Sequence, residues 1–319
     1  MNHELYRGFY RAHLFPQPGL GSSLRPHESA PVTEFFAAVA RISVLVFLVS
    51  SMSEIGLGLR LQQIVLPLRN ARLVVFALLA NFIIAPLLAL GMARLLRLDQ
   101  PFALGLLLLG LAAGAPFMPK IAGMAKGDVA LAVGLLVMLM VGTIVFLPVA
   151  LPLLVKGTQV NPGKIVRLLI LLILLPLTVG LIVKARAALF AGRLAFVLGR
   201  VSGVALLATT ILIIALHLPS LLRVFGTGAI YAGLLFSVLS ALSGWLLGGG
   251  DAVHRTVLGL GTGFRSFPAA LIVSVQNFTD PNVSVMVIVT TLSALVVLLP
   301  AAWLMGKREP ATLNQLDRP

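Results

Sequence analysis

The chain has 319 residues, of which 59% are hydrophobic and 11% are charged, and its mean hydropathy is +1.05. Because a soluble domain carries about 25% charged residues, this composition excludes an ordinary soluble protein and indicates a chain that spans a membrane. The net charge is +14 and there is no cysteine. Nucleic-acid binding is not expected, since no basic helix with interleaved aromatic residues occurs, and disulfides and thiolate metal sites are excluded.

Residues 1–34 are polar and rich in Pro, Gly and Ser, without the apolar core of a secretory signal. We expect a disordered tail there, or a stretch that is not expressed. Nine hydrophobic segments follow, each about 20 residues or longer, which is enough to cross roughly 30 Å of hydrocarbon as a helix. They are 35–57, 71–96, 102–124, 129–155, 165–183, 194–216, 226–247, 253–275 and 283–305. The expected transmembrane domain is 35–306, with halves 35–155 and 165–306, before a tail at 307–319.

Basic residues gather in the short connections between these segments, where they anchor helices and set orientation. If the N-terminus is outside, ten lie in inside connections and six in outside ones, which favours N-terminus outside and C-terminus inside. We expect an integral protein of a bacterial inner membrane. The inside set is Arg60, Arg69, Arg72, Lys126, Lys184, Arg186, Arg193, Arg255, Lys307 and Arg308; the outside set is Arg94, Arg97, Lys156, Lys164, Arg167 and Arg223.

A ten-residue pattern, G-L-x-x-G-x-x-x-x-P, occurs at 110–119 (GLAAGAPFMP) and at 259–268 (GLGTGFRSFP). The two copies lie in the third and eighth segments, which cross the membrane in opposite directions. This predicts inverted repeats with two discontinuous, crossing helices, in an all-α polytopic membrane protein of about nine transmembrane helices. The expected unwinding positions are Gly114, Pro116, Pro119, Gly261, Gly263 and Pro268.

Two basic residues, Arg265 and Lys120, lie in these interrupted segments, although a charge at the bilayer centre costs about 2.5–3.5 kcal/mol. Of the ten acidic residues, only Glu54 lies in a span, near its end, so an internal ion pair for both cations is hard to build. Two interpretations stay open. Each cation binds an anionic ligand, for which the Arg fork suits a carboxylate or sulfonate, or it serves structure alone. For Arg265 the structural role is to tie broken helix ends, whose free carbonyls carry partial negative charge.

Asn81, Thr262 and Ser266 are polar candidates for the same substrate cavity, with helix-to-helix or backbone hydrogen bonds as the alternative. The five His residues never cluster with acids at ligand spacing, so no metal site is expected. No nucleophile with a nearby base is visible, so the chain is not expected to be an enzyme.

Two stretches resemble the bile acid:sodium symporter family. The first stretch, residues 55–137, contains the sequences GLGLRLQQI, FALGLLLLG and KIAGMAKGDVALAVGLL. The second, residues 252–273, reads AVHRTVLGLGTGFRSFPAALIV. The resemblance spans roughly 45–304. It implies two inverted five-helix repeats, nine helices where the first is absent, and separate core and panel domains. It also implies transport of organic anions, such as bile acids or small carboxylates, by alternating access.

The resemblance further implies a sodium site, and here the sequence departs from the family. Where family members carry sodium ligands, this chain has Met118, Pro119, Ala132, Leu136 and Gly261; a family Gln is Arg265, and another corresponds to Asn81. We therefore expect Arg265, with Lys120, to supply as fixed charge what bound sodium supplies in relatives. The alternative function is a membrane receptor or assembly protein that kept the fold but lost transport, and it predicts no substrate-sized cavity at the crossover.

Overall fold

The computed structural model describes residues 31–59, 70–155, 161–216 and 227–307, and in these ranges the chain is helical without a strand. Residues 1–35 form one unit and residues 36–319 another. The second unit, called here the membrane unit, contains the candidate site. Of the expected tails and loops, residues 1–30 and 308–319 lie outside the described ranges, as do Arg60, Arg69, Lys156 and Arg223.

Eight described helices are long and apolar enough to cross a membrane, so the expected all-α polytopic fold is confirmed. The expected segment 102–124 is not among the eight, because it is divided into two helices of 12 and 7 residues, each too short to span alone. In chain order the helices are α2 (Pro31–Gly58), α4 (Ala71–Leu79), η2 (Ala80–Ile84), α5 (Ala85–Leu95), α6 (Gln100–Leu111), α7 (Met118–Met124), α8 (Val129–Leu154), α9 (Pro162–Leu169), η3 (Ile170–Leu174), α10 (Leu175–Arg186), α11 (Ala188–Leu216), α13 (Ala229–Leu247), α14 (Ala252–Gly263), α15 (Phe267–Asn277) and α16 (Pro281–Lys307).

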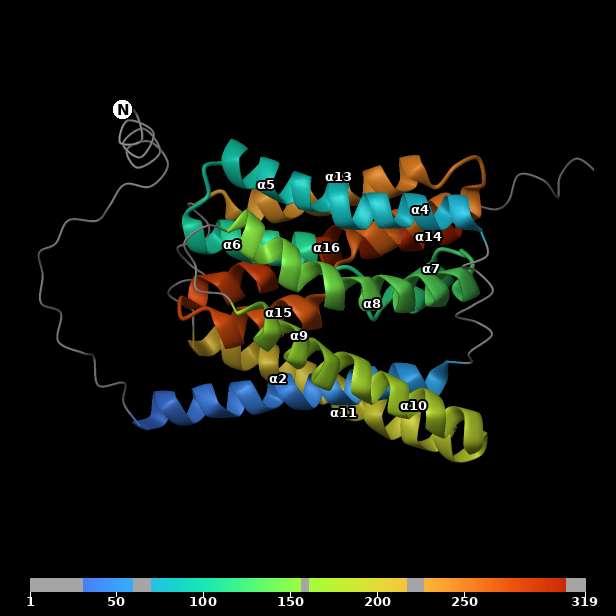
Figure 1. The fold of residues 1–319 in the computed structure, drawn as a ribbon, viewed down its shortest axis with the longest axis horizontal. Helices are drawn as coiled ribbons and strands as arrows, with labels where there is room; N and C mark the ends of the chain where they lie inside the picture. The colour runs from blue at the N-terminus through green and yellow to red at the C-terminus, as the bar shows by residue number, and fades with distance from the viewer. Residues whose placement is uncertain (1–30, 60–69, 156–160, 217–226, 308–319) are drawn as a thin grey trace, which may run out of the picture. The chain divides into compact units, whose positions relative to one another are not determined.

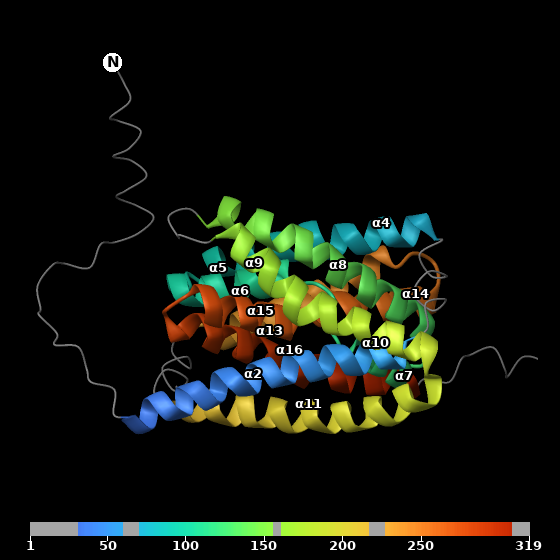
Figure 2. The same ribbon diagram turned by 60° about the horizontal axis from the view of Figure 1, so that its bottom comes forward.

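Within the membrane unit, α2, α10 and α11 lie side by side in both ribbon views (Figures 1 and 2). We call them the panel helices, and α4 to α8 with α13 to α16 the crossover bundle. Two glycines let α2 and α10 approach closely. A Cβ atom at Gly56 would lie 2.2 Å from Leu177 O, and one at Gly180 would lie 2.7 Å from Ser53 O. Such small-residue contacts are typical of helix pairs in membranes, where backbones pack without intervening side chains.

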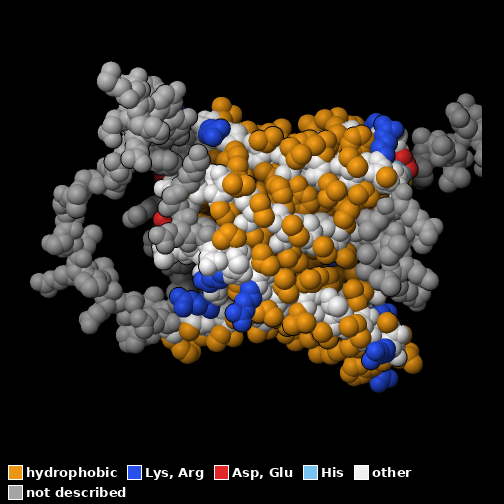
Figure 3. All heavy atoms as spheres, viewed as in Figure 1, with side chains coloured by type: hydrophobic (Ala, Val, Ile, Leu, Met, Phe, Trp, Pro, Cys, Tyr) orange, Lys and Arg blue, Asp and Glu red, His pale blue; other side chains and the backbone are white. Residues whose placement is uncertain are grey.

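The surface agrees with a lipid environment. Apolar side chains cover the middle of the face shown in Figure 3, and Lys and Arg side chains gather toward the ends of the helices. On α8, for example, Val145, Val149 and Leu153 are each more than half exposed. Basic residues flanking an apolar band are typical of transmembrane helices.

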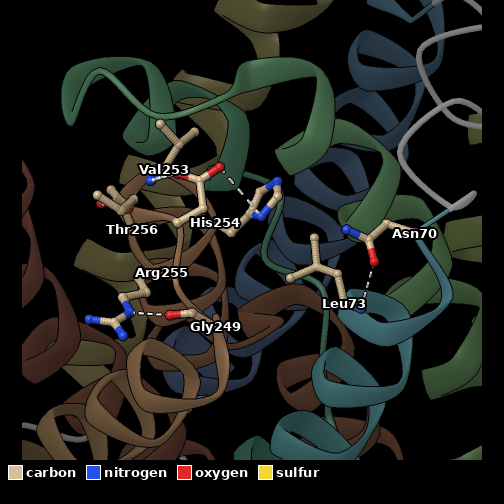
Figure 4. Close-up of polar contacts among 9 residues, drawn as sticks. Asn70, Leu73, Gly249, Val253, His254, Arg255 and Thr256 are labelled. Carbon is tan, nitrogen blue, oxygen red and sulfur yellow. Dashed lines mark hydrogen bonds and ion pairs between the residues drawn. The ribbon is translucent and has the colours of Figure 1, made fainter.

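Local hydrogen bonds fix where the helices of the crossover bundle begin (Figure 4). Leu73 N donates to the side chain of Asn70 at the start of α4, at 3.2 Å. The turn between α13 and α14 is held by Arg255, whose Nε donates to Gly249 O. These contacts satisfy backbone groups that a helix end leaves free.

Two non-helical stretches, 112–117 and 264–266, interrupt the third and eighth expected segments. They touch, because Ser266 N donates to Ala112 O at 2.9 Å. Thr143 on α8 holds the first stretch: its hydroxyl accepts from Ala113 N at 2.8 Å and lies 3.1 Å from Ala113 O. Gly114 has φ of +82°, which glycine adopts at little cost. The relation of the two halves by an inverted repeat stays a prediction.

The expected unwinding positions divide into two groups. Gly114 and Pro116 lie in the first interruption, and Pro119 and Pro268 are each the second residue of a helix, where a missing N–H is tolerated. The expectation is wrong for Gly261 and Gly263, which lie in the last turn of α14. The physical reason at Gly263 is packing against α13, since a Cβ there would lie 2.7 Å from Ala241 Cβ.

Gly56→Ala should destabilise the protein, because the new methyl group meets the Leu177 carbonyl at 2.2 Å. Overpacking of this kind typically costs about 1–3 kcal/mol. The measurement is the midpoint of thermal unfolding of the purified protein in detergent. Gly58→Ala is the control, because a Cβ there meets nothing within 4 Å; equal midpoints for the two variants would contradict the close α2–α10 contact.

Thr143→Val keeps the side-chain shape but leaves the buried N–H and C=O of Ala113 without their partner. An unsatisfied buried group costs about 1–3 kcal/mol, so the thermal midpoint should fall. Thr178→Val is the matched control, because the exposed Thr178 hydroxyl donates to Leu174 O, four residues earlier in the same span. If both variants unfold at the same temperature, Thr143 does not support the interruption.

Candidate functional site

The guanidinium of Arg265 lies at the meeting point of the two interruptions and is bound by neutral oxygens. Its Nε donates to Leu109 O at 3.0 Å, and its Nη2 to Gly110 O at 2.6 Å. Both carbonyls belong to the last turn of α6, where the helix dipole favours a cation. Nη2 also donates to Asn81 O at 3.1 Å, and Nη1 donates to Asn81 Oδ1. With 7% of its surface exposed, Arg265 ties broken helix ends together, which is the structural one of its two expected roles.

The Asn81 carbonyl is free to accept from Arg265 because of a proline five residues later. Asn81 lies in the π-turn η2, where the N–H of Ala85 donates back to Ala80 O. The next residue is Pro86, which has no N–H to donate. The local sequence therefore leaves an orphan carbonyl inside the apolar core. Such a group is costly unless it finds a donor, and Arg265 provides one.

Asn81, Thr262 and Arg265 form one buried hydrogen-bonded chain. Asn81 Nδ2 donates to Thr262 Oγ1 at 3.2 Å and to Ala77 O at 3.0 Å. Both side chains are fully buried. Ser266 differs: its hydroxyl is buried and finds no hydrogen-bond partner among the described residues. The structure thus brings three of the five candidate binding residues into direct contact, beside a fourth that has an unused hydroxyl.

A pocket of about 320 Å³ lies between the panel helices and the first interruption. Small-molecule sites are typically about 300–1,000 Å³ and mostly apolar, so this pocket fits a small guest. Lys120 is the candidate binding residue that lines it, whereas Arg265, Asn81, Thr262 and Ser266 do not. The lining residues are Phe47, Ser51, Glu54, Ile55, Gly58, Leu59, Pro116, Phe117, Pro119, Lys120, Val133, Gly199, Ser202, Gly203 and Leu206.

Of the two cations for which an internal ion pair was expected to be hard to build, Lys120 has a carboxylate partner. Its Nζ lies 3.6 Å from Glu54 Oε1. The pair forms because the last turns of α2 bring Glu54 beside the first turn of α7. No carboxylate of the described residues pairs with Arg265, so for this cation the expectation agrees with the structure.

The residues at the implied sodium positions do not fit a sodium ion. Hard cations take several oxygen ligands, but Met118, Ala132, Leu136 and Gly261 have no side-chain oxygen. Met118 fills the space instead, since a Cβ at Gly261 would lie 2.3 Å from its Cε and 2.9 Å from its Sδ. Met118, Ala132 and Leu136 are each at most 1% exposed. An apolar cluster therefore occupies the region where the resemblance implies ligands.

The sequence reasoning missed two features of the site. From the sequence, Glu54 is assigned no binding role, because this residue lies near a span end. An ionisable residue inside a span is nevertheless a functional candidate by default. The hydroxyl of Ser202 on α11, which donates to Glu54 Oε2 at 3.3 Å, had no distinguishing signal, because serine is common in membrane helices.

Comparison with known proteins identifies the family. Over 146 residues the chain is 30% identical to a Bacillus subtilis (strain 168) protein described as "Uncharacterized sodium-dependent transporter YocS". That match covers 44% of this chain and 44% of the relative, so it spans less than half of the relative's length. A match to the Sodium Bile acid symporter family covers residues 45–223. This is more than half of the chain, which therefore belongs to the sodium bile acid symporter family of membrane transporters.

Proposed function

We propose that the chain transports small organic anions by alternating access and without coupling to sodium. The observation that carries the proposal is the buried charge of Arg265. It makes four hydrogen bonds to neutral oxygens and has no carboxylate partner in the described part of the chain. A fixed cation therefore lies beside the interruptions, at a position where the family resemblance implies a neutral glutamine.

The replaced ligand positions support the absence of sodium coupling. In relatives, the resemblance implies that a bound cation brings positive charge to the crossover. Here Met118 occupies that space, and Arg265 supplies a positive charge that is part of the chain. Since charge is poorly screened in a low-dielectric interior, Arg265 favours an anion in the pocket beside the first interruption without touching it.

The pocket supports transport over the alternative of a receptor or assembly protein. Its volume of about 320 Å³ and its apolar walls suit a small amphipathic molecule, and Lys120 provides a cation at its edge. The alternative function, a receptor or assembly protein, predicts no substrate-sized cavity at the crossover. We further propose a bacterial plasma-membrane location with the N-terminus outside, on the distribution of basic connections.

The first test is sodium dependence in proteoliposomes. Taurocholate, octanoate and benzenesulfonate are first screened by thermal shift, and uptake of those that bind is then measured. Because the sodium-site positions lack oxygens, initial rates should agree within about twofold with and without a sodium gradient, as expected when two ligands do not couple. Choline replaces sodium in the control, so that ionic strength is unchanged. Strong stimulation by sodium would refute the proposal.

The second test is Arg265→Gln, which removes the fixed charge but keeps a polar side chain. Because the charge of Arg265 favours an anion without touching it, its loss should lower uptake about tenfold, which corresponds to about 1.4 kcal/mol. Arg265→Lys keeps the charge without the fork and should retain more activity than Arg265→Gln. Arg193→Gln, at an exposed position on α11, is the control, and size-exclusion chromatography checks folding. Full activity in Arg265→Gln would contradict the fixed-charge role.

A further inference from the structure

The pocket contains one ion pair that joins the panel helices to the crossover bundle. Of its lining residues, the ionisable ones are Glu54 from α2 and Lys120 from α7. Their Nζ and Oε1 atoms lie 3.6 Å apart. A single negative charge and a single positive charge are therefore paired in the lining of the space in which a substrate would bind.

The carboxylate of Glu54 is held against the panel side. Ser202 on α11 donates to its Oε2 at 3.3 Å. Gly199, one turn away, makes room for the carboxylate, since a Cβ atom there would lie 2.8 Å from Oε1. The carboxylate can thus stay with α11 through these contacts when Lys120 leaves it.

Lys120, by contrast, is loosely held. Its side chain is 73% exposed, against 26% for Glu54. An ion pair this open to solvent contributes little stability, and a lysine ammonium is a compact charge on a flexible stem. Another carboxylate or a sulfonate can therefore replace Glu54 at Lys120 with little loss.

We propose that Glu54 pairs with Lys120 when no substrate is bound, and that the anionic group of the substrate displaces the Glu54 carboxylate from Lys120. The apolar body of the substrate then lies against Phe47, Phe117 and Leu206, which line the same pocket. This inference rests on the proposed transport of organic anions and narrows it to small monoanions with one carboxylate or sulfonate. A second negative charge is disfavoured, because the displaced Glu54 carboxylate remains on the facing wall. Displacement also removes a contact between two groups of helices that alternating access must move relative to each other.

The test measures the binding of octanoate and benzenesulfonate to the purified full-length protein in detergent. Thermal shift and calorimetry are the two readouts. Octanamide serves as the neutral analogue, and potassium chloride keeps ionic strength constant. In Glu54→Gln both the competitor for Lys120 and its repulsion of an incoming anion are gone, so both anions should bind about threefold to tenfold more tightly than to the wild type. Lys120→Gln should lose binding of both anions, while octanamide should bind the two variants equally. Lys126→Gln, at an exposed position outside the pocket, should behave as the wild type.

The outcomes separate this inference from the proposed function. If the wild type binds and transports an anion but Glu54→Gln gains no affinity, or Lys120→Gln loses none, exchange at Lys120 is wrong and anion transport stands. If neither the wild type nor Glu54→Gln binds either anion, both proposals fail. Tighter binding to Glu54→Gln together with loss in Lys120→Gln supports the exchange.

Discussion

A buried guanidinium joins the interruption between α14 and α15 to α6 and to η2. Arg265 fills the space between the last turn of α6 and the π-turn η2, and its donors go to the carbonyls of Leu109, Gly110 and Asn81. An interrupted helix in a bilayer leaves carbonyls that no water can satisfy, and a buried arginine is costly without acceptors. The free carbonyls give the guanidinium its acceptors, and the guanidinium gives the carbonyls their donors. The interruptions and the cation therefore depend on each other.

This arrangement divides the two membrane cations between different tasks. Arg265 is 7% exposed and its donors are directed at the backbone and Asn81, so on the proposed function it acts on the pocket through its charge alone. The Lys120 side chain is 73% exposed and lies where a guest can reach it. A side chain that holds the backbone cannot also change its binding partner in each cycle of the proposed transport, whereas a loosely paired lysine can.

The sequence predicted the helical fold and the meeting of two interrupted segments, because hydropathy and paired Gly/Pro patterns are local signals. It could not choose between carbonyls and a ligand as partners of Arg265, because that choice depends on where α6 and η2 meet in space. It placed Gly261 and Gly263 in an unwound stretch, although glycine serves close helix packing as readily as unwinding. The Lys120–Glu54 pair joins residues 66 positions apart, and no spacing rule within a helix relates them.

Replacing a bound cation by a fixed one changes the charge that moves in each transport cycle. A sodium ion that crosses with a monoanion cancels its charge, whereas Arg265 remains in the protein. On the proposed function, inward movement of one negative charge against about 100 mV, inside negative, costs about 2.3 kcal/mol. Export avoids this cost, and exchange of one monoanion for another moves no net charge. With the displacement proposed at Lys120, the lysine is paired with a substrate or with Glu54 at every step of either cycle, so no step leaves its charge without a partner.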